Sequence, residues 1–147
     1  MGILRAIPFL PGEKRSRSKP SRHGKGILVR DEFHCGSLEL KIVRQWIPGQ
    51  GYKIPCAAVV PPNPRGQALV VHGYGGCKEE QLGLAWRMAE DGIAACAMDL
   101  RGHGEHPRQL DDHALEDLES ALSYLRKNGP VAIVGHSFGA RLALHCG

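Results

Sequence analysis

The chain has few aromatic residues, no long hydrophobic run and no C-x-x-C pair. Aromatic residues make up 5% of the 147 residues, and none lies within the basic run near the N-terminus, which weakens a role in stacking on single-stranded nucleic acid. The lack of an apolar run of about 18 residues argues against a membrane span. Five cysteines are an odd number without metal-ligand spacing, so we interpret them as reduced core residues. These absences indicate a soluble globular protein.

The net charge of +4 is distributed unevenly along the chain. Residues 1–30 contain eight basic residues and one acidic residue, whereas residues 31–147 contain eleven and fourteen. The basic stretch 14–22 is rich in serine and proline, which predicts a disordered, dispensable segment over 1–30 and a folded unit over 31–147. Residues 3–10 are too short and too interrupted for a signal peptide, so we expect a cytoplasmic protein. We expect no nucleic-acid partner, because a short basic run is a weak signal for one.

Hydrophobic periodicity predicts a strand pair followed by strands that alternate with helices. Apolar and polar residues alternate over 38–42 and 52–60, on either side of the turn residues 48–51, which predicts an antiparallel pair. Later apolar and amphipathic segments predict strands over 68–71, 93–98 and 131–134 and helices over 78–91 and 114–127. Asp111 and Asp112 are positioned to cap the second helix. Strands alternating with such helices predict an α/β fold with a parallel sheet and helices on both faces.

Gly135, Ser137 and Gly139 form a G-x-S-x-G motif directly after the apolar run 131–134. A serine held in a strained turn between a strand and a helix needs neighbours without bulk, and the two glycines provide them. Helix-forming residues follow from position 140, so the motif has the context of a nucleophile elbow. The alternative interpretation is that Ser137 caps a helix on an ordinary turn.

Two further glycine-rich loops follow predicted buried strands. His72 and Gly73 open the first, and the second is Asp-Leu-Arg-Gly-His-Gly over 99–104. In this order, the two loops and the motif around Ser137 closely resemble the α/β-hydrolase fold, in particular its esterase and acylglycerol-lipase-like serine hydrolases. The resemblance covers about residues 37–147, the N-terminal half of such a domain. It implies a doubly wound, mostly parallel sheet, truncated after the elbow and preceded by the antiparallel strand pair.

The same resemblance implies the chemistry of the site. Ser137 would attack the carbonyl of a small-molecule ester-like substrate, and the backbone N–H groups of Phe138 and Tyr74 would stabilise the oxyanion. Four motif residues would support this geometry: His72, Gly73, Gly135 and Gly139. No cofactor is implied.

The triad acid and histidine of such a hydrolase follow the serine in chain order, and this sequence contains neither. Asp99 precedes Ser137, and His136 adjoins it on a tight turn, where neighbouring side chains diverge. His145 follows eight residues later, roughly 12 Å away along a helix. We therefore predict that these 147 residues belong to a serine hydrolase that is catalytic only with a further segment. The alternative is a non-catalytic product that serves as an interaction module.

Three histidines and three aspartates over 99–113 raise the question of a metal site. They are His103, His106, His113, Asp99, Asp111 and Asp112. Their spacing matches no ligand pattern, so no metal is predicted.

The predicted strand 131–134 lies at the edge of the truncated sheet. Strand residues without a neighbour offer unpaired N–H and C=O groups to another chain. We therefore predict oligomers or aggregates formed through this sheet edge.

Overall fold

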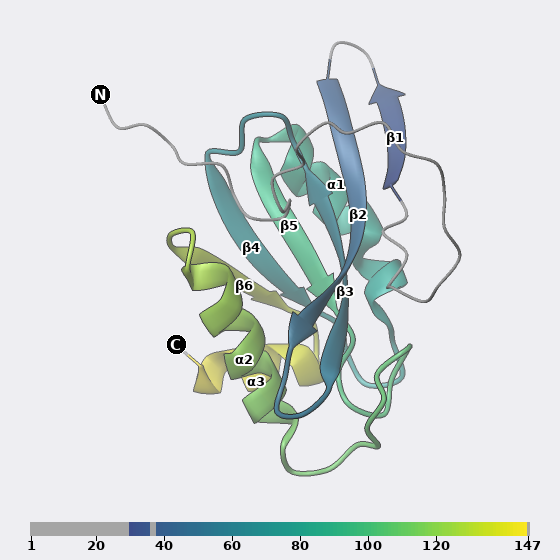
Figure 1. The fold of residues 1–147 in the computed structure, drawn as a ribbon, viewed down its shortest axis with the longest axis vertical. Coiled ribbons are helices and arrows are strands. Elements are labelled where there is room, and N and C mark those ends of the chain that lie inside the picture. The colour runs from purple at the N-terminus through teal and green to yellow at the C-terminus, as the bar shows by residue number, and fades with distance from the viewer. Residues whose placement is uncertain (1–29, 36–37, 147) are drawn as a thin grey trace, which may run out of the picture.

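The computed structural model describes residues 30–35 and 38–146, with side chains from residue 39. A six-stranded sheet with strand order β1-β2-β3-β5-β4-β6 lies at the centre, and helices cover both of its faces (Figure 1). The strands are β1 (Arg30–Cys35), β2 (Leu38–Pro48), β3 (Lys53–Val60), β4 (Gly66–Val71), β5 (Ile93–Met98) and β6 (Val131–Gly135). The helices are the 3₁₀ helix η1 (Lys78–Gln81), α1 (Leu82–Glu90), α2 (Ala114–Arg126) and α3 (Phe138–His145).

The sheet is mixed. β1–β2, β2–β3 and β3–β5 pair antiparallel, while β4 pairs parallel with both β5 and β6. The predicted antiparallel pair is confirmed as β2 and β3, with Ile47 opposite Ile54 beside the turn. β1 was not predicted, and it adds a third antiparallel pairing to the sheet. Parallel pairing is limited to β5, β4 and β6. The doubly wound α/β architecture is confirmed.

Side chains of the central strands divide between two cores, because successive residues of a strand point to opposite faces. Leu69 and Val71 of β4 belong to the core that contains α2. Val70, between them, packs in the core that contains Ala85 and Ala89 of α1. Figure 1 shows α2 in front of the sheet and α1 behind it. Helices therefore cover both faces, as predicted.

The two predicted crossover helices are present, with differences at their N-termini. The segment 78–91 begins as η1 before α1, and it ends at Gly92, which has φ 78°. The predicted caps of α2 are wrong, since the residue at the N-cap is His113 and no side chain caps the helix. The Asp111 carboxylate accepts the N–H of His113 and also binds the Arg101 guanidinium. A charge-assisted partner draws the carboxylate away from the helix end.

β6 is an edge strand that pairs only with β4. Ala132 is exposed and the other residues of β6 are half-buried. Val131 and Ile133 pack against the core that contains α2, and Val134 packs against the core that contains Ala85 and Ala89, so side chains of β6 contact the cores on both faces of the sheet. The uncovered apolar edge that the sequence predicted is present.

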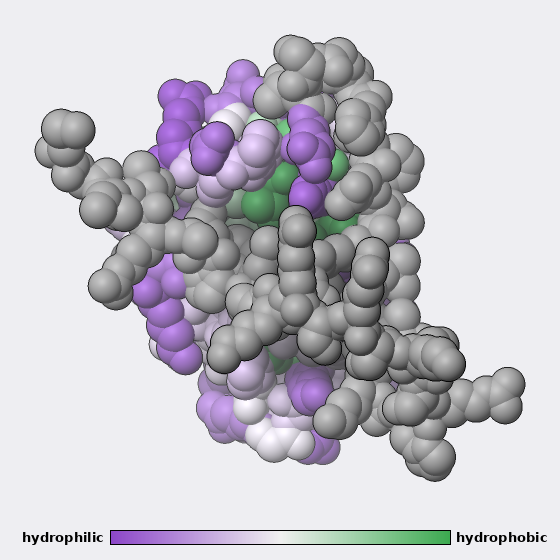
Figure 2. Space-filling model, turned by 45° about the horizontal axis from the view of Figure 1, so that its top comes forward, coloured by the Kyte–Doolittle hydropathy of each residue, from purple (hydrophilic) through white to green (hydrophobic). Residues whose placement is uncertain are grey.

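One face of the molecule is drawn as a space-filling view in Figure 2. Figure 2 shows hydrophilic side chains over most of the described surface on one face, with hydrophobic ones visible between them. None of the helices within the described ranges combines the length and the apolar character of a membrane span. The basic segment 1–30 lies outside these residues except for Arg30, which begins β1. Its predicted disorder, the absence of a nucleic-acid partner and the cytoplasmic location stay predictions.

Candidate active site

Ser137 lies at the turn between β6 and α3. Its backbone has φ 51° and ψ −112°, and it is the only non-glycine residue with positive φ in the described chain. Such a conformation costs on the order of 1–3 kcal/mol and persists only where the surrounding structure enforces it. The residue is exposed and its side chain makes no cap hydrogen bond to α3. This geometry argues against an ordinary helix cap and matches a strained elbow.

Backbone contacts explain the two glycines of the motif. A Cβ on Gly135 would lie 2.6 Å from the N and Cα atoms of Ala140. A Cβ on Gly139 would lie 2.5 Å from the carbonyl oxygen of His72. Because these neighbours are backbone atoms, a larger residue would displace a helix or a strand end. The elbow thus packs directly on the end of β4.

The loop 72–77 runs beside the elbow. A Cβ on Gly73 would lie 3.3 Å from the Cβ of Ser137 and 2.8 Å from Nδ1 of His136. The backbone of Gly73 therefore borders the serine, and the His136 ring lies against this loop. The structure brings together the two segments that the sequence predicted to form the site.

Two backbone N–H groups of these segments are unbonded. Phe138 is the first residue of α3, and within residues 38–146 neither its N–H nor that of Tyr74 donates a hydrogen bond to the protein. The Tyr74 side chain is 76% exposed, and its ring packs edge-on against His103 with 5.4 Å between centroids. Both N–H groups are free to bind a ligand oxygen.

His72 is buried and ties two loops together. The Leu100 N–H donates to Nε2 at 3.0 Å, so Nδ1 carries the proton and donates to the Gly73 carbonyl oxygen at 2.7 Å. Burial lowers the pKa of His72, although the hydrogen bond with Gly73 acts in the opposite direction. With both nitrogens occupied and the ring neutral, His72 is a structural residue rather than a base.

A buried lysine holds the other end of the loop. The Lys78 Nζ lies 2.7 Å from Asp99, 2.8 Å from Glu105 and 3.0 Å from Glu79. Burial alone lowers the pKa of Lys78, but hydrogen bonds to the three carboxylates outweigh it and raise the pKa well above its usual range. Asp99 also accepts the backbone N–H groups of Lys78 and Glu105 at 2.8 and 2.9 Å. We call His72, Lys78, Asp99 and Glu105 the loop-side cluster.

A second buried carboxylate, Asp117, lies on the inner face of α2. It accepts hydrogen bonds from the Tyr52 hydroxyl and from Arg101 Nε at 2.6 Å, and His106 Nε2 lies 3.2 Å away. Burial raises the pKa of Asp117, but the bonds with His106, Arg101 and Tyr52 outweigh burial and lower it. We call Tyr52, Arg101, His106 and Asp117 the helix-side cluster. It joins the β2–β3 turn, the loop after β5 and α2.

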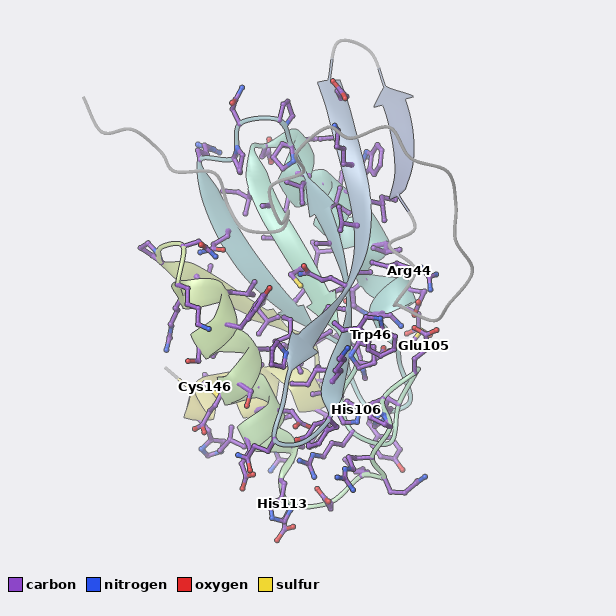
Figure 3. All side chains as sticks on the ribbon, in the orientation of Figure 1. Arg44, Trp46, Glu105, His106, His113 and Cys146 are labelled. Carbon is purple, nitrogen blue, oxygen red and sulfur yellow. The ribbon has the colours of Figure 1, made fainter. Side chains whose placement is uncertain are left out.

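Arg44 of β2 lies at the rim of the loop-side cluster, close to Glu105 (Figure 3). Its guanidinium nitrogens are 3.9 Å from Glu105 and 3.6 Å from Glu79. Both Arg44 and Glu105 are about half exposed, at 48% and 54%. Exposed pairs of this kind contribute little, so the cluster depends on its buried members.

Within residues 39–146, the Ser137 side chain makes no hydrogen bond to another residue. His103 Nδ1 is 2.7 Å from the Arg101 carbonyl oxygen, and His145 is at the far end of α3 from the serine. Asp99 is occupied by Lys78. The absence of a triad acid and histidine from the chain stays a prediction.

The histidines and aspartates of the loop after β5 separate in the structure. Asp99 and His106 belong to the two clusters, and His103 bonds to a carbonyl. Asp111, Asp112 and His113 offer ligand atoms within 4.8 Å of one another, but all three are exposed. Exposed acidic groups are common without an ion, and the geometry offers no closed ligand set.

Comparisons with known proteins agree with this geometry. A family model described as "Serine aminopeptidase, S33" matches residues 62–147, which include both loops and the elbow. An uncharacterized abhydrolase domain-containing protein of Dictyostelium discoideum is 35% identical over 88 residues, which are 56% of this chain and 9% of that protein.

Solved structures of hydrolases share the fold. An epoxide hydrolase from Vigna radiata matches with TM-score 0.61 and 22% identity over 71% of this chain and 35% of that one. Est1E from Butyrivibrio proteoclasticus, with ferulic acid bound, matches with TM-score 0.63 and 23% identity over 69% and 46%. A structure from Klebsiella pneumoniae that is named as a dienelactone hydrolase matches with TM-score 0.59 and 24% identity, over 73% of this chain and 54% of that one. The chain thus spans about a third to a half of these structures, and likeness at such identities concerns the fold alone.

Proposed function

The chain belongs to the serine aminopeptidase S33 family of α/β-hydrolases, and from this we propose that it carries the nucleophile and oxyanion site of a serine hydrolase for ester-like acyl substrates. Ser137 is the nucleophile, and the backbone N–H groups of Phe138 and Tyr74 bind the oxyanion. The observation that carries the proposal is the strained backbone of Ser137, with φ 51° and an exposed side chain that caps nothing.

The mechanism follows from these positions. The Ser137 Oγ attacks the carbonyl carbon of the ester, and its proton passes to a general base. The negative charge on the carbonyl oxygen is held by the Phe138 N–H, at the positive end of α3, and by the Tyr74 N–H. The alcohol then leaves with a proton, and water releases the acid from the acyl-serine.

The general base comes from chain outside the described residues. This is supported by the absence of a histidine bonded to Ser137 within residues 38–146 and by the 35% of the Vigna radiata structure that the chain covers. The 147 residues alone are therefore inactive. The second candidate, a non-catalytic interaction module, applies if the 147-residue chain is itself the mature product.

The decisive experiment compares the 147-residue chain with an extended protein, meaning these residues joined to the segment encoded after them. We expect only the extended protein to hydrolyse a short aryl ester and to react with a fluorophosphonate. Ser137→Ala should abolish labelling and lower kcat by about 10⁴-fold or more, because removing such a serine in a studied protease costs about 10⁶.

Ser123→Ala is the matched control, because Ser123 is exposed on α2 and should leave both readouts unchanged. Labelling that persists in Ser137→Ala would overturn the proposal. Turnover of the 147-residue chain that depends on Ser137 would instead show that one of its own histidines is the base. A stop codon after Gly147, with a stable inactive product, would favour the interaction module.

The exposed edge of β6 supports a further part of the proposal, that the 147-residue chain self-associates. Ala132 is exposed on this strand, and a lysine on an edge strand hinders pairing with another chain. Gel filtration should show concentration-dependent oligomers, which Ala132→Lys reduces. A sharp monomer peak for the unaltered chain at every concentration would contradict this expectation.

A further inference from the structure

The Lys78–Asp99 ion pair is buried to a degree unusual for charged side chains, with 1% and 0% of the two side chains exposed. Desolvating two charges costs much of what their attraction gains, so apolar residues in their place are often as stable. Stability alone is thus a weak reason for a lysine at this position. The pair is better understood through the geometry that it imposes.

The Asp99 carboxylate holds two chain segments at once. It accepts the backbone N–H and the Nζ of Lys78, at 2.8 and 2.7 Å, and the backbone N–H of Glu105 at 2.9 Å. The loop after β5 wraps so closely around it that a Cβ on Gly104 would lie 2.4 Å from the carboxylate. Asp99 therefore sets the distance between the start of η1 and this loop.

The loop 72–77 is fixed at both ends. At its start, His72 is tied to the Leu100 N–H, and the carbonyl of His72 packs against Gly139 of the elbow. Immediately after its end, Lys78 is tied to Asp99 through main chain and side chain. Between these anchors lie Gly73, which borders Ser137, and Tyr74 with its unbonded N–H.

We propose that Lys78 and Asp99 are positioning residues of the hydrolase site, which hold the Tyr74 N–H where it meets the substrate oxyanion. This inference rests on the proposed function. Neither residue touches the substrate. Loss of the pair lets the loop 72–77 move. Displacing an oxyanion donor by about 1 Å removes much of the transition-state stabilisation that the donor provides.

The first test measures hydrogen exchange of the 147-residue chain and needs no activity. In Lys78→Met, the hydrogen-bonded amides of Gly76 and of residue 78 should exchange about tenfold faster, relative to those of β4 and β5, than in the unaltered chain. Arg101→Met is the matched control, because Arg101 belongs to a buried ion pair on the other side of the same loop. It should leave the relative exchange of these two amides unchanged. Equal effects of both variants would overturn the inference.

The second test measures turnover of the extended protein. Lys78→Met should lower kcat by about 10²-fold with KM changed less than about threefold. Lys78→Met/Asp99→Asn removes both charges, so it should recover part of the lost melting temperature but none of the lost kcat. Recovery of kcat together with stability would overturn the positioning role. If Ser137→Ala retains turnover, the proposed function fails instead, and the exchange experiment still decides the role of the pair in the loop.

Discussion

The loop between β5 and α2 is held at its two sides by buried carboxylates that differ in what they join. In the loop-side cluster, Asp99 binds backbone groups and a lysine of neighbouring loops around the serine. In the helix-side cluster, Asp117 of α2 binds side chains of the β2–β3 turn and of the loop. One cluster orders short segments beside the elbow, and the other attaches a helix to the sheet.

The difference indicates that two similarly buried carboxylates have different structural roles. Asp117 gathers Tyr52, Arg101 and His106 from distant parts of the chain, so its loss loosens the packing of α2. Asp99 acts within loops that already follow the ends of β4 and β5, so its loss loosens the loops more than the fold. Removing each carboxylate in turn separates these effects.

The largest stability effect is expected for Asp117→Asn. Breaking a buried pair leaves the Arg101 guanidinium less compensated and costs about 3 kcal/mol, or about 10 °C in Tm. Asp99→Asn should cost less, because Lys78 keeps Glu105 and Glu79 as partners. Thermal denaturation followed by circular dichroism measures both, with Glu119→Gln on the exposed face of α2 as the control. An equal or larger loss for Asp99→Asn would show that the two clusters do not divide in this way.

The pH dependence of stability gives a smaller difference between the two clusters. The folded-state pKa of His72 lies below its usual 6.5, so its contribution to stability is complete above about pH 6.5 and is lost as the pH falls through the folded pKa. The pKa of Asp117 lies below 3.8, so its contribution is complete above that pH and is lost only in stronger acid. As the pH falls from 6.5 towards 3.8, the contribution of His72 is therefore lost while that of Asp117 is kept.

Urea denaturation between pH 7.5 and 5 measures the loop-side contribution. One proton changes the free energy of unfolding by at most about 1.4 kcal/mol per pH unit. His72→Gln should reduce the slope of stability against pH in this range, while Glu119→Gln on the exposed face of α2 should not. An unchanged slope in His72→Gln would contradict the neutral, buried role of this histidine.

The smallest effects are expected at the rims of the clusters. Glu105→Gln and Asp111→Asn each remove an exposed carboxylate, one from Lys78 and one from Arg101. Since solvent screens such groups, each variant should lower Tm by less than about 2 °C. A larger loss in calorimetry for either variant would show that its cluster depends on the rim as well as on its buried carboxylate.

Local chain chemistry was enough to predict the elbow, its two glycines, the parallel strands and the crossover helices. Glycine requirements, apolar runs and helical periodicity act over a few neighbouring residues, and they appear in the structure where they were expected. Gly135 and Gly139 also lie against backbone atoms as their type suggests, and Gly73 lies against side-chain atoms of His136 and Ser137. Where local signals were incomplete, as for the caps of α2 or the strand β1, the assignment failed.

Only the tertiary structure decided which charged residues are buried and with whom. Lys78 reaches Asp99 across 21 residues, and Tyr52 reaches Asp117 across 65. Lys78 has no local signal, and Asp117 occupies a helix face where periodicity favours an apolar residue. A charge can be buried only where a partner compensates its lost hydration, and that partner is supplied by the folding of distant segments rather than by neighbours in the chain.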